Sequence, residues 1–204
     1  MKVFASVVLA ILLTAPIYLS AQLGSQAEEK EPGLKCYLPY SVKKDHMVMG
    51  CEVSGYHMRY DLAQKIGVFM ILLPDDANSI EEAVTYFSIQ TFAFDGKSLK
   101  ELLDADVKDI LQRRPGTNVV KNLAHKIPLA AGGNCIGAEL AFPKQSSAFP
   151  SESFYFCDAG SKNYAVMFSL GARSKEAMDG AYPSFMKWID VPHRIKDATI
   201  LEER

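Results

Sequence analysis

The chain has 204 residues, of which 49% are hydrophobic and 23% charged, with 22 basic and 24 acidic side chains. This length suits one globular domain and leaves no room for two large ones, and the apolar content excludes a disordered chain. A net charge of -2 argues against strong nucleic-acid binding, because counterion release needs clustered positive charge.

The first 21 residues have the pattern of a secretory signal peptide. Lys2 precedes an apolar run over residues 3–13, and small residues follow as far as Ala21, after which we place the cleavage. The alternative is an N-terminal membrane anchor, but the polar segment 22–30 leaves fewer than the roughly 20 apolar residues that a span needs. Removing 21 of 204 residues, one of them basic, would leave 183 residues and a net charge of -3.

This pattern predicts export, either to a periplasm or out of the cell. No cysteine follows the apolar run, so a lipid anchor is not expected, and no later segment is long and apolar enough to span a membrane. Residues 22–33 are charged and have nothing to bury, which predicts a flexible leader. A single domain is then expected over residues 34–190.

The four cysteines are predicted to form two disulfides, because an exported protein meets an oxidising compartment. Cys36 and Cys51 flank a polar tip in a segment that suggests a hairpin. Cys135 and Cys157 flank a loop with a proline at each end, and an antiparallel register that sets them opposite each other brings Glu139 opposite Ser153. The same register places apolar residues of both strands on one face: Ile136, Ala138, Leu140, Phe142, Phe154 and Phe156. We therefore favour pairs 36–51 and 135–157, with four free buried thiols as the alternative.

The next segments predict two strands. Residues 66–73 are an apolar run that Pro74 ends, as expected for a strand covered on both faces. Residues 84–94 are rich in β-branched and aromatic side chains and predict a long strand, after which Asp95-Gly96 marks a turn.

The clearest helix begins at Ser98, which has with Glu101 the spacing of a capping box. Leucine, valine and isoleucine recur at helical intervals after it, and Pro115-Gly116 ends the pattern. Four strand-like segments follow with no helix between them and predict an antiparallel meander: 117–128, 134–142, 153–157 and 164–170.

A second helix is predicted over residues 175–189, with Ser174 as its cap. Pro183 either kinks this helix or marks its true start. Residues 191–204 are expected to be a polar C-terminal tail. The elements together predict an α+β fold, in which two main helices flank an antiparallel β-sheet.

Several of these segments together resemble the PsbP-like superfamily, which includes extrinsic proteins of photosystem II, Ran-binding import factors and DcrB-like envelope proteins. The resembling segments lie within residues 64–190: 66–74, 98–102, 115–116, 154–170 and 177–189. The resemblance implies a small extracytoplasmic module, with α/β/α layers, that binds or assists a larger partner. The chain departs from the lipid-anchored DcrB-like proteins because it lacks a lipid-accepting cysteine, and it matches no photosystem II contact residue.

One motif has the form of a catalytic turn. Gly133-Asn134-Cys135-Ile136-Gly137 is like a hydrolase nucleophile elbow with cysteine in place of serine, and Asp158 or Asp179 and then His193 would complete a triad. An elbow needs a helix after it, however, and residues 138–142 alternate like a strand. A disulfide would also consume the thiolate. We therefore expect no catalytic residue, and a small cysteine hydrolase using Cys135 and His193 is the alternative.

No metal or cofactor site is predicted. The turn Asp75-Asp76 is more simply solvated, and Gly132-Gly133 lacks the lysine and the serine or threonine of a phosphate-binding loop. We expect His46 and His57 in exposed loops and His193 in the tail. The histidines are too scattered for a metal signature: His46, His57, His125 and His193.

A modest basic cluster is a candidate binding surface for an anionic partner. Arg113 and Arg114 end the first helix, and Lys121, His125 and Lys126 lie in the strand segment after it. They would form one patch if that strand returned beside the helix end. The alternative is that the arginines only complement the helix dipole.

The leading interpretation is an exported, non-enzymatic accessory or binding module. Its expected partner is a protein of the envelope or the extracellular space, and we expect neither nucleic acid nor a cofactor. The alternatives are the cysteine hydrolase and a structural protein of the envelope stress response.

Overall fold

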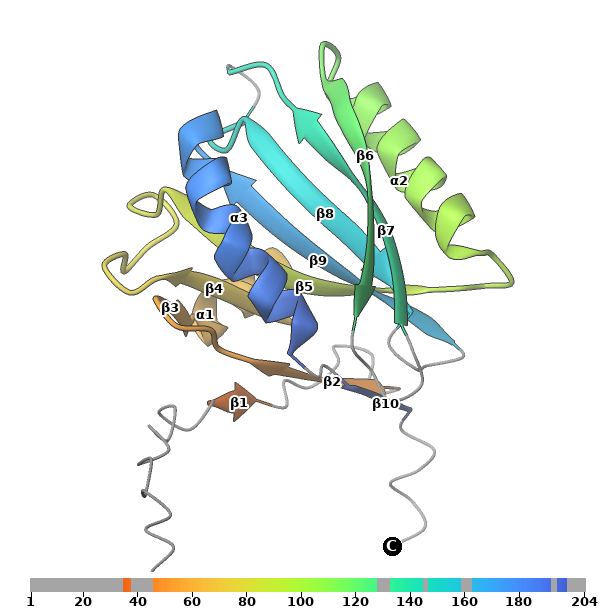
Figure 1. Ribbon diagram of the computed structural model, residues 1–204, viewed down its shortest axis with the longest axis horizontal. Coiled ribbons are helices and arrows are strands. Elements are labelled where there is room, and N and C mark those ends of the chain that lie inside the picture. Colours follow the sequence, from red (N-terminus) through yellow and green to blue (C-terminus); the bar gives the residue numbers. More distant parts are fainter. Residues whose placement is uncertain are drawn as a thin grey trace, which may run out of the picture. The chain divides into compact units, whose positions relative to one another are not determined.

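The computed structural model describes residues 35–37, 46–127, 133–144, 147–158, 163–191 and 194–197. The predicted signal peptide (1–21) and leader (22–33) lie outside these residues. Within them the chain has the predicted α+β fold, an antiparallel sheet with helices on both faces (Figure 1).

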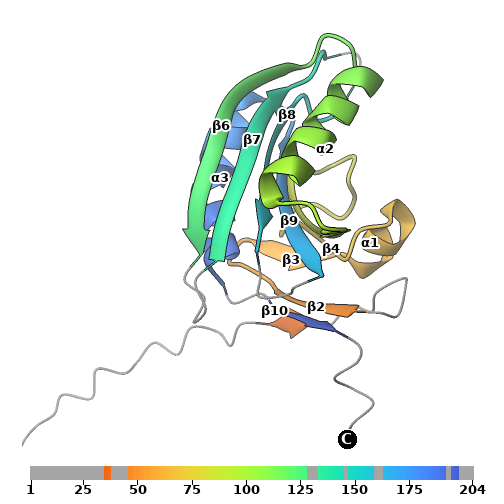
Figure 2. The ribbon, with the colours of Figure 1, turned by 90° about the vertical axis from the view of Figure 1, so that its right-hand side faces the viewer.

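The main sheet of the described part has seven strands in the order β3-β4-β5-β9-β8-β7-β6. Helices α1 (Tyr60–Ile66) and α2 (Leu99–Arg113) lie on one face, and α3 (Lys175–Asp190) lies on the other (Figure 2). The strands are β3 (Tyr56–Met58), β4 (Met70–Pro74), β5 (Thr85–Ala93), β6 (Asn118–Ile127), β7 (Gly133–Ala141), β8 (Ser151–Cys157) and β9 (Tyr164–Ala172).

Strands β6 to β9 pair in succession as the predicted meander, and β9 then pairs with β5 along its whole length. The predicted register of β7 and β8 is confirmed, because Cys135 lies opposite Cys157 and Glu139 lies opposite Ser153. The structure contains the Cys135–Cys157 disulfide, with an S–S distance of 2.04 Å. The meander therefore fixes which side chains face each helix.

Helix α2 begins with the predicted capping box. The Ser98 hydroxyl accepts a hydrogen bond from the backbone amide of Glu101, and the Glu101 carboxylate accepts one from the backbone amide of Ser98. Gly116 follows the helix with a φ of +86°, a conformation that favours glycine. The helix packs through leucines and partly buried apolar residues onto the sheet face that carries Leu140, Phe154 and Phe156.

The apolar run at residues 66–73 was predicted as one strand, and this is wrong for its first residues. Ile66 is the last residue of α1, Gly67 caps that helix with a φ of +78°, and β4 begins only at Met70. The remaining strand is covered on both faces as predicted, since Met70 and Leu72 pack with the α3 side and Ile71 and Leu73 with the α1 side. Arg59, at the start of α1, makes no side-chain cap, so no capping signal marks the start of this helix in the sequence.

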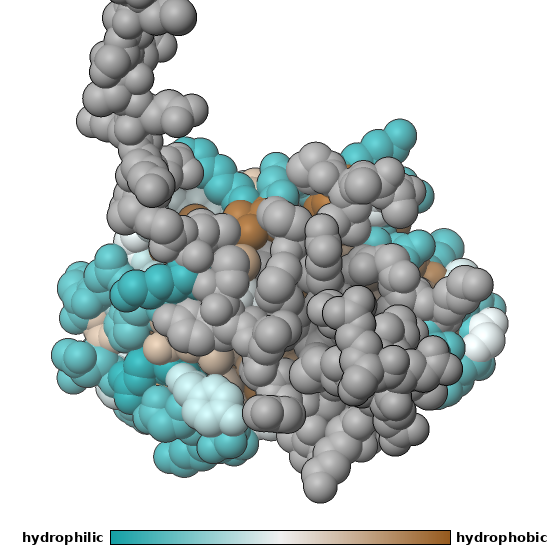
Figure 3. All heavy atoms as spheres, turned by 90° about the horizontal axis from the view of Figure 1, so that it is seen from below, coloured by the Kyte–Doolittle hydropathy of each residue, from teal (hydrophilic) through white to brown (hydrophobic). Residues whose placement is uncertain are grey.

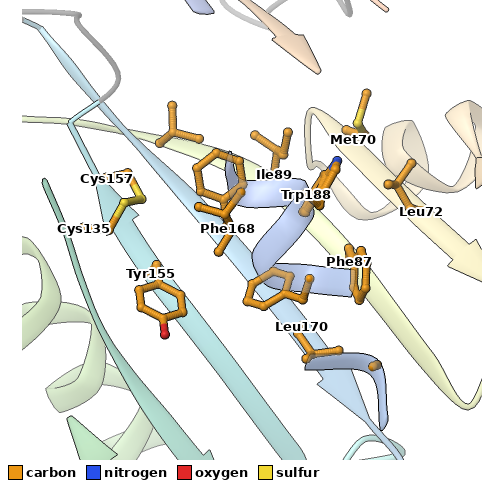
Figure 4. Packing of buried hydrophobic residues seen from close by; sticks show 14 of the residues in the cluster. Met70, Leu72, Phe87, Ile89, Cys135, Tyr155, Cys157, Phe168, Leu170 and Trp188 are labelled. Atoms are coloured by element: carbon orange, nitrogen blue, oxygen red, sulfur yellow. A yellow bond between two sulfur atoms is a disulfide. The ribbon is translucent and has the colours of Figure 1, made fainter. Parts of the chain in front are cut away.

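Helix α3 runs without interruption from Lys175 to Asp190, with Pro183 inside it, so the helix does not start at the proline. The Ser174 hydroxyl accepts a hydrogen bond from the backbone amide of Ala177, as predicted for a cap. Its buried side chains pack against β4, β5, β8 and β9 (Figure 4). Trp188 lies at the centre of this core, and its indole nitrogen donates a hydrogen bond of 2.6 Å to the Cys51 carbonyl.

A second, three-stranded sheet consists of β1 (Cys36–Tyr37), β2 (His46–Cys51) and β10 (Arg194–Asp197). Strand β1 pairs with β2 in a register that sets Cys36 opposite Cys51, and Cys51 is disulfide-bonded. Residues 194–197, which were expected in a polar tail, form β10 and pair with β2. The pairing joins residues about 150 positions apart, and no local signal in the sequence encodes it.

Within the described ranges, no helix is long and apolar enough to cross a membrane. On the face that Figure 3 shows, hydrophilic side chains predominate among the coloured residues, and a few hydrophobic ones lie between them.

Candidate functional site

A cavity of about 270 Å³ lies between the C-terminal half of α2 and the main sheet. We call it the α2 pocket. Its lining combines acidic, basic, amide and aromatic side chains: Gln90, Phe92, Asp106, Ile110, Arg113, Arg114, Phe142, Glu152, Phe154 and Met167. A concave site with an apolar floor and a few polar groups is the usual form of a binding site.

Alternation along the strands and helical spacing bring these residues together. Gln90 and Phe92 of β5 point to the α2 face, as do Glu152 and Phe154 of β8, because residues two apart in a strand share a face. In α2, Asp106 and Ile110 are one turn apart and Arg113 lies on the next turn. Phe142, which follows β7, and Met167 of β9 complete the lining, so five segments contribute to one small site.

The carboxyl groups of the α2 pocket are shifted toward their protonated forms. Burial raises the pKa of Glu152 to about 7, Asp106 adds to this rise, and the nearby Arg114 opposes it. Burial likewise raises the pKa of Asp106, which Arg113 lowers in part. Among the described residues, the side chains of Gln90, Asp106 and Glu152 have no hydrogen-bond or ion-pair partner. The two carboxyl groups of the pocket are thus balanced electrostatically by the two arginines that line it.

Two arginines complete the rim of the α2 pocket. Arg113 forms an ion pair with Asp109 one turn earlier, and both side chains are exposed. The guanidinium of Arg114 lies over the ring of Phe142, 4.8 Å from its centroid. The Arg114 side chain is therefore stacked on an aromatic ring at the mouth of the pocket.

Tyr86 of β5 lies near the Glu152 side of the α2 pocket. A Cβ atom at Gly171 would overlap the Tyr86 ring, so glycine at this position lets the ring lie against β9. Burial raises the pKa of the Tyr86 phenol, and the Glu152 carboxylate adds to the rise. Phe149 packs edge-on against Tyr86, with ring centroids 4.9 Å apart.

The predicted basic cluster does not form one surface. A β-bulge lies between Val119 and Lys121, so Val119 pairs with Leu140 on the α2 face and Lys121 pairs with Glu139 on the α3 face. Lys126 lies near the opposite end of β6 from the arginines. The structure thus assigns Arg113 and Arg114 to the α2 pocket and separates them from Lys121 and Lys126.

Lys121 instead belongs to a polar cluster on the α3 face. Its Nζ lies 2.9 Å from Oε2 of Glu139, and Nζ of Lys175 lies 3.3 Å from Oε1 of the same carboxylate. The Tyr155 and Tyr182 hydroxyls, 2.5 Å apart, link β8 to α3. These contacts join the end of the sheet to α3 and have a structural role.

The glycines of the elbow-like motif are explained by strand packing. A Cβ atom at Gly137 would overlap the carbonyl oxygen of Phe154 in β8, and one at Gly133 would overlap Ile127 in β6. Cys135 is bonded to Cys157, and the motif continues as β7 without a helix. His193, the histidine of the alternative triad, lies outside the described residues.

His57 and His125 do not line the α2 pocket. His57 was expected in an exposed loop, but it lies half-buried in β3, with Nδ1 3.7 Å from Oδ1 of Asp75. His125 lies in β6, with Nε2 2.7 Å from Oδ1 of Asp190. The backbone of His46 belongs to β2. In the part of the chain that the structure describes, no three potential ligands are grouped as a metal site would need.

Sequence reasoning missed Asp106, Glu152 and Gln90, although two of them left a signal. Asp106 interrupts the apolar face of α2, four residues before Ile110. Glu152 precedes Phe154 and Phe156 in the same alternating face of β8. A charged residue at a position where the periodicity of apolar residues predicts a buried side chain is a candidate for a functional site.

The sequence matches no protein-family model and no curated protein sequence. The structure is similar to that of cyanobacterial PsbP from Synechocystis sp. PCC 6803, with 9% identity, a TM-score of 0.47 and coverage of 80% of this chain and 92% of that one. It is also similar to the Ran-binding protein Mog1p of Saccharomyces cerevisiae, with 8% identity, a TM-score of 0.43 and coverage of 82% and 98%.

Proposed function

We propose that this protein is an exported, non-enzymatic binding module that holds a protein partner on the α2 side of its sheet. The observation that carries the proposal is the α2 pocket, in which charged and amide side chains gather over a floor of phenylalanines. A cavity that places a few polar groups over an apolar floor is the usual form of a binding site.

A second cavity beside α2 supports the proposal that a partner binds on this side of the sheet. It has a volume of about 410 Å³ and lies on the other flank of α2, against β6 and β7. Leu111 and Val119, which line it, are 38% and 43% exposed. Apolar side chains gathered around an exposed helix favour a protein contact.

The disulfides support export and a non-enzymatic role. Cys135 and Cys157 are bonded to each other, and Cys51 is disulfide-bonded as well, which favours an oxidising compartment. The bond at Cys135 also removes the thiolate that the hydrolase alternative requires. The other alternative, a structural protein of the envelope stress response, does not require a pocket. A partner bound at α2 would argue against this alternative.

Photocrosslinking in the native host tests the proposal. A photoreactive amino acid at Gln112, on the exposed side of α2, is expected to capture a defined partner, and the same group at Lys187 on α3 is the matched control. Gln90→Phe, which fills the α2 pocket, is expected to abolish the capture while the melting temperature shows that the protein is folded. Equal capture at Lys187, or capture that Gln90→Phe leaves unchanged, would refute the proposal.

A further inference from the structure

We propose that an extended segment of the protein partner adds to the main sheet as a further strand, beside the outer edge of β6. This inference rests on the proposed function and names how the partner is held. Among the described strands of the main sheet, β6 has a neighbour on one side only, because the strand order ends there (Figure 2). Its outer edge therefore offers backbone donors and acceptors to another chain.

The hydrogen bonding of the meander determines which peptide groups of β6 face outward. The amide of Asp158 donates to the carbonyl of Asn134, so the peptide groups of Asn134 face β8 and those of the next residue, Cys135, face β6. Cys135 lies opposite His125, whose peptide groups therefore bond to β7. After the bulge, every second residue of β6 then has its N–H and C=O on the outer side: Asn122, Ala124 and Lys126.

An apolar groove lies beside the same edge. The second cavity, of about 410 Å³, lies between the outer flank of α2 and the face of β6 and β7 below it, and we call it the edge groove. Its apolar side chains come from both walls: Leu103, Val107 and Leu111 of α2, Val119 of β6 and Ala138 of β7. A strand beside β6 would turn every second side chain toward this groove, so main-chain hydrogen bonds and apolar packing would form together.

The charges at this edge favour an acidic segment. Strand β6 contains no acidic residue. Its Lys121 pairs with Glu139, whereas Lys126 of β6 and Lys108 of α2, which lines the edge groove, have no ion pair within the described residues. A second copy of this chain would bring the same basic side chains to its own β6, and like charges on neighbouring strands repel. The occupant is therefore a different protein.

The side chains of β6 also set the spacing that the partner needs. Asn122 lines the edge groove, and Lys126, four residues later, faces the same side of the sheet. A complementary segment has an apolar side chain beside Asn122 and an acidic one beside Lys126, so four positions separate them. The segment recognised is thus extended, apolar at alternate positions and acidic at one end.

Amide hydrogen exchange of the folded, disulfide-bonded protein, followed by NMR, tests the inference with the capped peptide Thr-Val-Thr-Val-Thr-Glu. The amides of Asn122, Ala124 and Lys126 are expected to exchange at least about tenfold more slowly when the peptide saturates the protein. The amides of Leu123 and His125 already bond to β7 and should not change. N-methylation of the peptide at the amides of one edge should abolish binding, and N-methylation at the other edge is the matched control.

Two variants test the edge and its charge. Ala124→Pro removes an outward N–H without removing a bond to β7, and it should weaken peptide binding at least about tenfold, whereas Ala124→Ser keeps the donor and should bind as the wild type does. Lys126→Glu should weaken binding about fivefold, and a peptide with lysine in place of glutamate should restore it. Lys65→Glu, at the end of α1, is the control and should leave binding unchanged.

Several results would overturn the inference. They are the absence of saturable binding, protection that does not alternate along β6, equal binding of both N-methylated peptides, or a dimer of this chain that protects the same amides. In the native host, Ala124→Pro should also abolish the crosslink at Gln112, which lines the edge groove. If that crosslink persists in Ala124→Pro, the added strand is wrong and the binding module stands; if the wild type gives no crosslink, both fall.

Discussion

The Nζ atom of Lys121 lies 2.9 Å from Oε2 of Glu139, a carboxylate whose side chain is only 5% exposed. The contact joins β6, at the edge of the sheet, to β7. Lys175, at the start of α3, lies 3.3 Å from the other oxygen of the same carboxylate. Two partly exposed lysines therefore neutralise one buried charge.

Lys121→Met is expected to lower the free energy of unfolding by about 1 to 2 kcal/mol, because it leaves a buried carboxylate with one partner. Urea denaturation measures the change. The double variant Lys121→Met/Glu139→Gln should be more stable than Lys121→Met, since it also removes the buried charge. Lys100→Met, whose ion pair with Asp104 is in solvent, is the control and should change stability by less than about 0.5 kcal/mol.

Ionisation of Glu152 is expected to lower the stability of the protein as the pH rises. The pKa of its carboxyl rises on folding from 4.5 to about 7, so between these values the folded state keeps a proton that the unfolded state has lost. The stability attributable to Glu152 is therefore expected to fall across this window, by on the order of 3 kcal/mol. Glu152→Gln should match the wild type near pH 4 and exceed it in stability at pH 8.

Glu176 supplies a control of opposite sign for that measurement. Hydrogen bonds from its own backbone amide and from Ser174 lower the pKa of this exposed carboxyl at the start of α3. Its ionised form therefore stabilises the fold above the unfolded pKa, and the effect is lost as the pH falls. Glu176→Gln should be less stable than the wild type at pH 8 and equal to it in acid. The same pH trend in both variants would contradict the assignment.

Gly137→Ala is expected to destabilise the protein severely, by about 3 kcal/mol or more, because its Cβ would overlap the Phe154 carbonyl across the β7–β8 ladder. Gly180→Ala is the matched control, since a Cβ there has nothing within 4 Å and the residue lies in α3. It should raise stability by up to about 1 kcal/mol. Thermal or urea unfolding compares them. If Gly137→Ala were well tolerated, the packing explanation of the motif would be wrong.

The thiol content discriminates between the binding module and the cysteine hydrolase. Thiol titration of the unfolded, unreduced protein should detect no free thiol. Replacing Cys135 and Cys157 together by alanine opens a loop with a sequence separation of 22 residues and should cost about 3 kcal/mol of stability. A reactive thiol at Cys135 in the native protein would support the hydrolase instead.

Local patterns predicted much of the fold. The capping box at Ser98 set the start of α2, and the cysteine spacing fixed the register of β7 and β8, because burial and the disulfide demand the same alignment. Helix α1 was missed because Arg59 provides no cap and its last residue continues into an apolar run. Strand β10 was missed because a short polar strand depends on a distant partner, β2.

The candidate site depended far more on tertiary structure. The sequence by itself determined the paired arginines at the end of α2, the cysteine pair 135–157 and the apolar periods of the sheet. The tertiary structure decided that a bulge after Val119 turns Lys121 to the other face, and that Asp106 and Glu152, 46 positions apart, share one cavity. Periodicity assigns a residue to a face of its own element, but only the pairing of strands and the seating of a helix determine which faces meet.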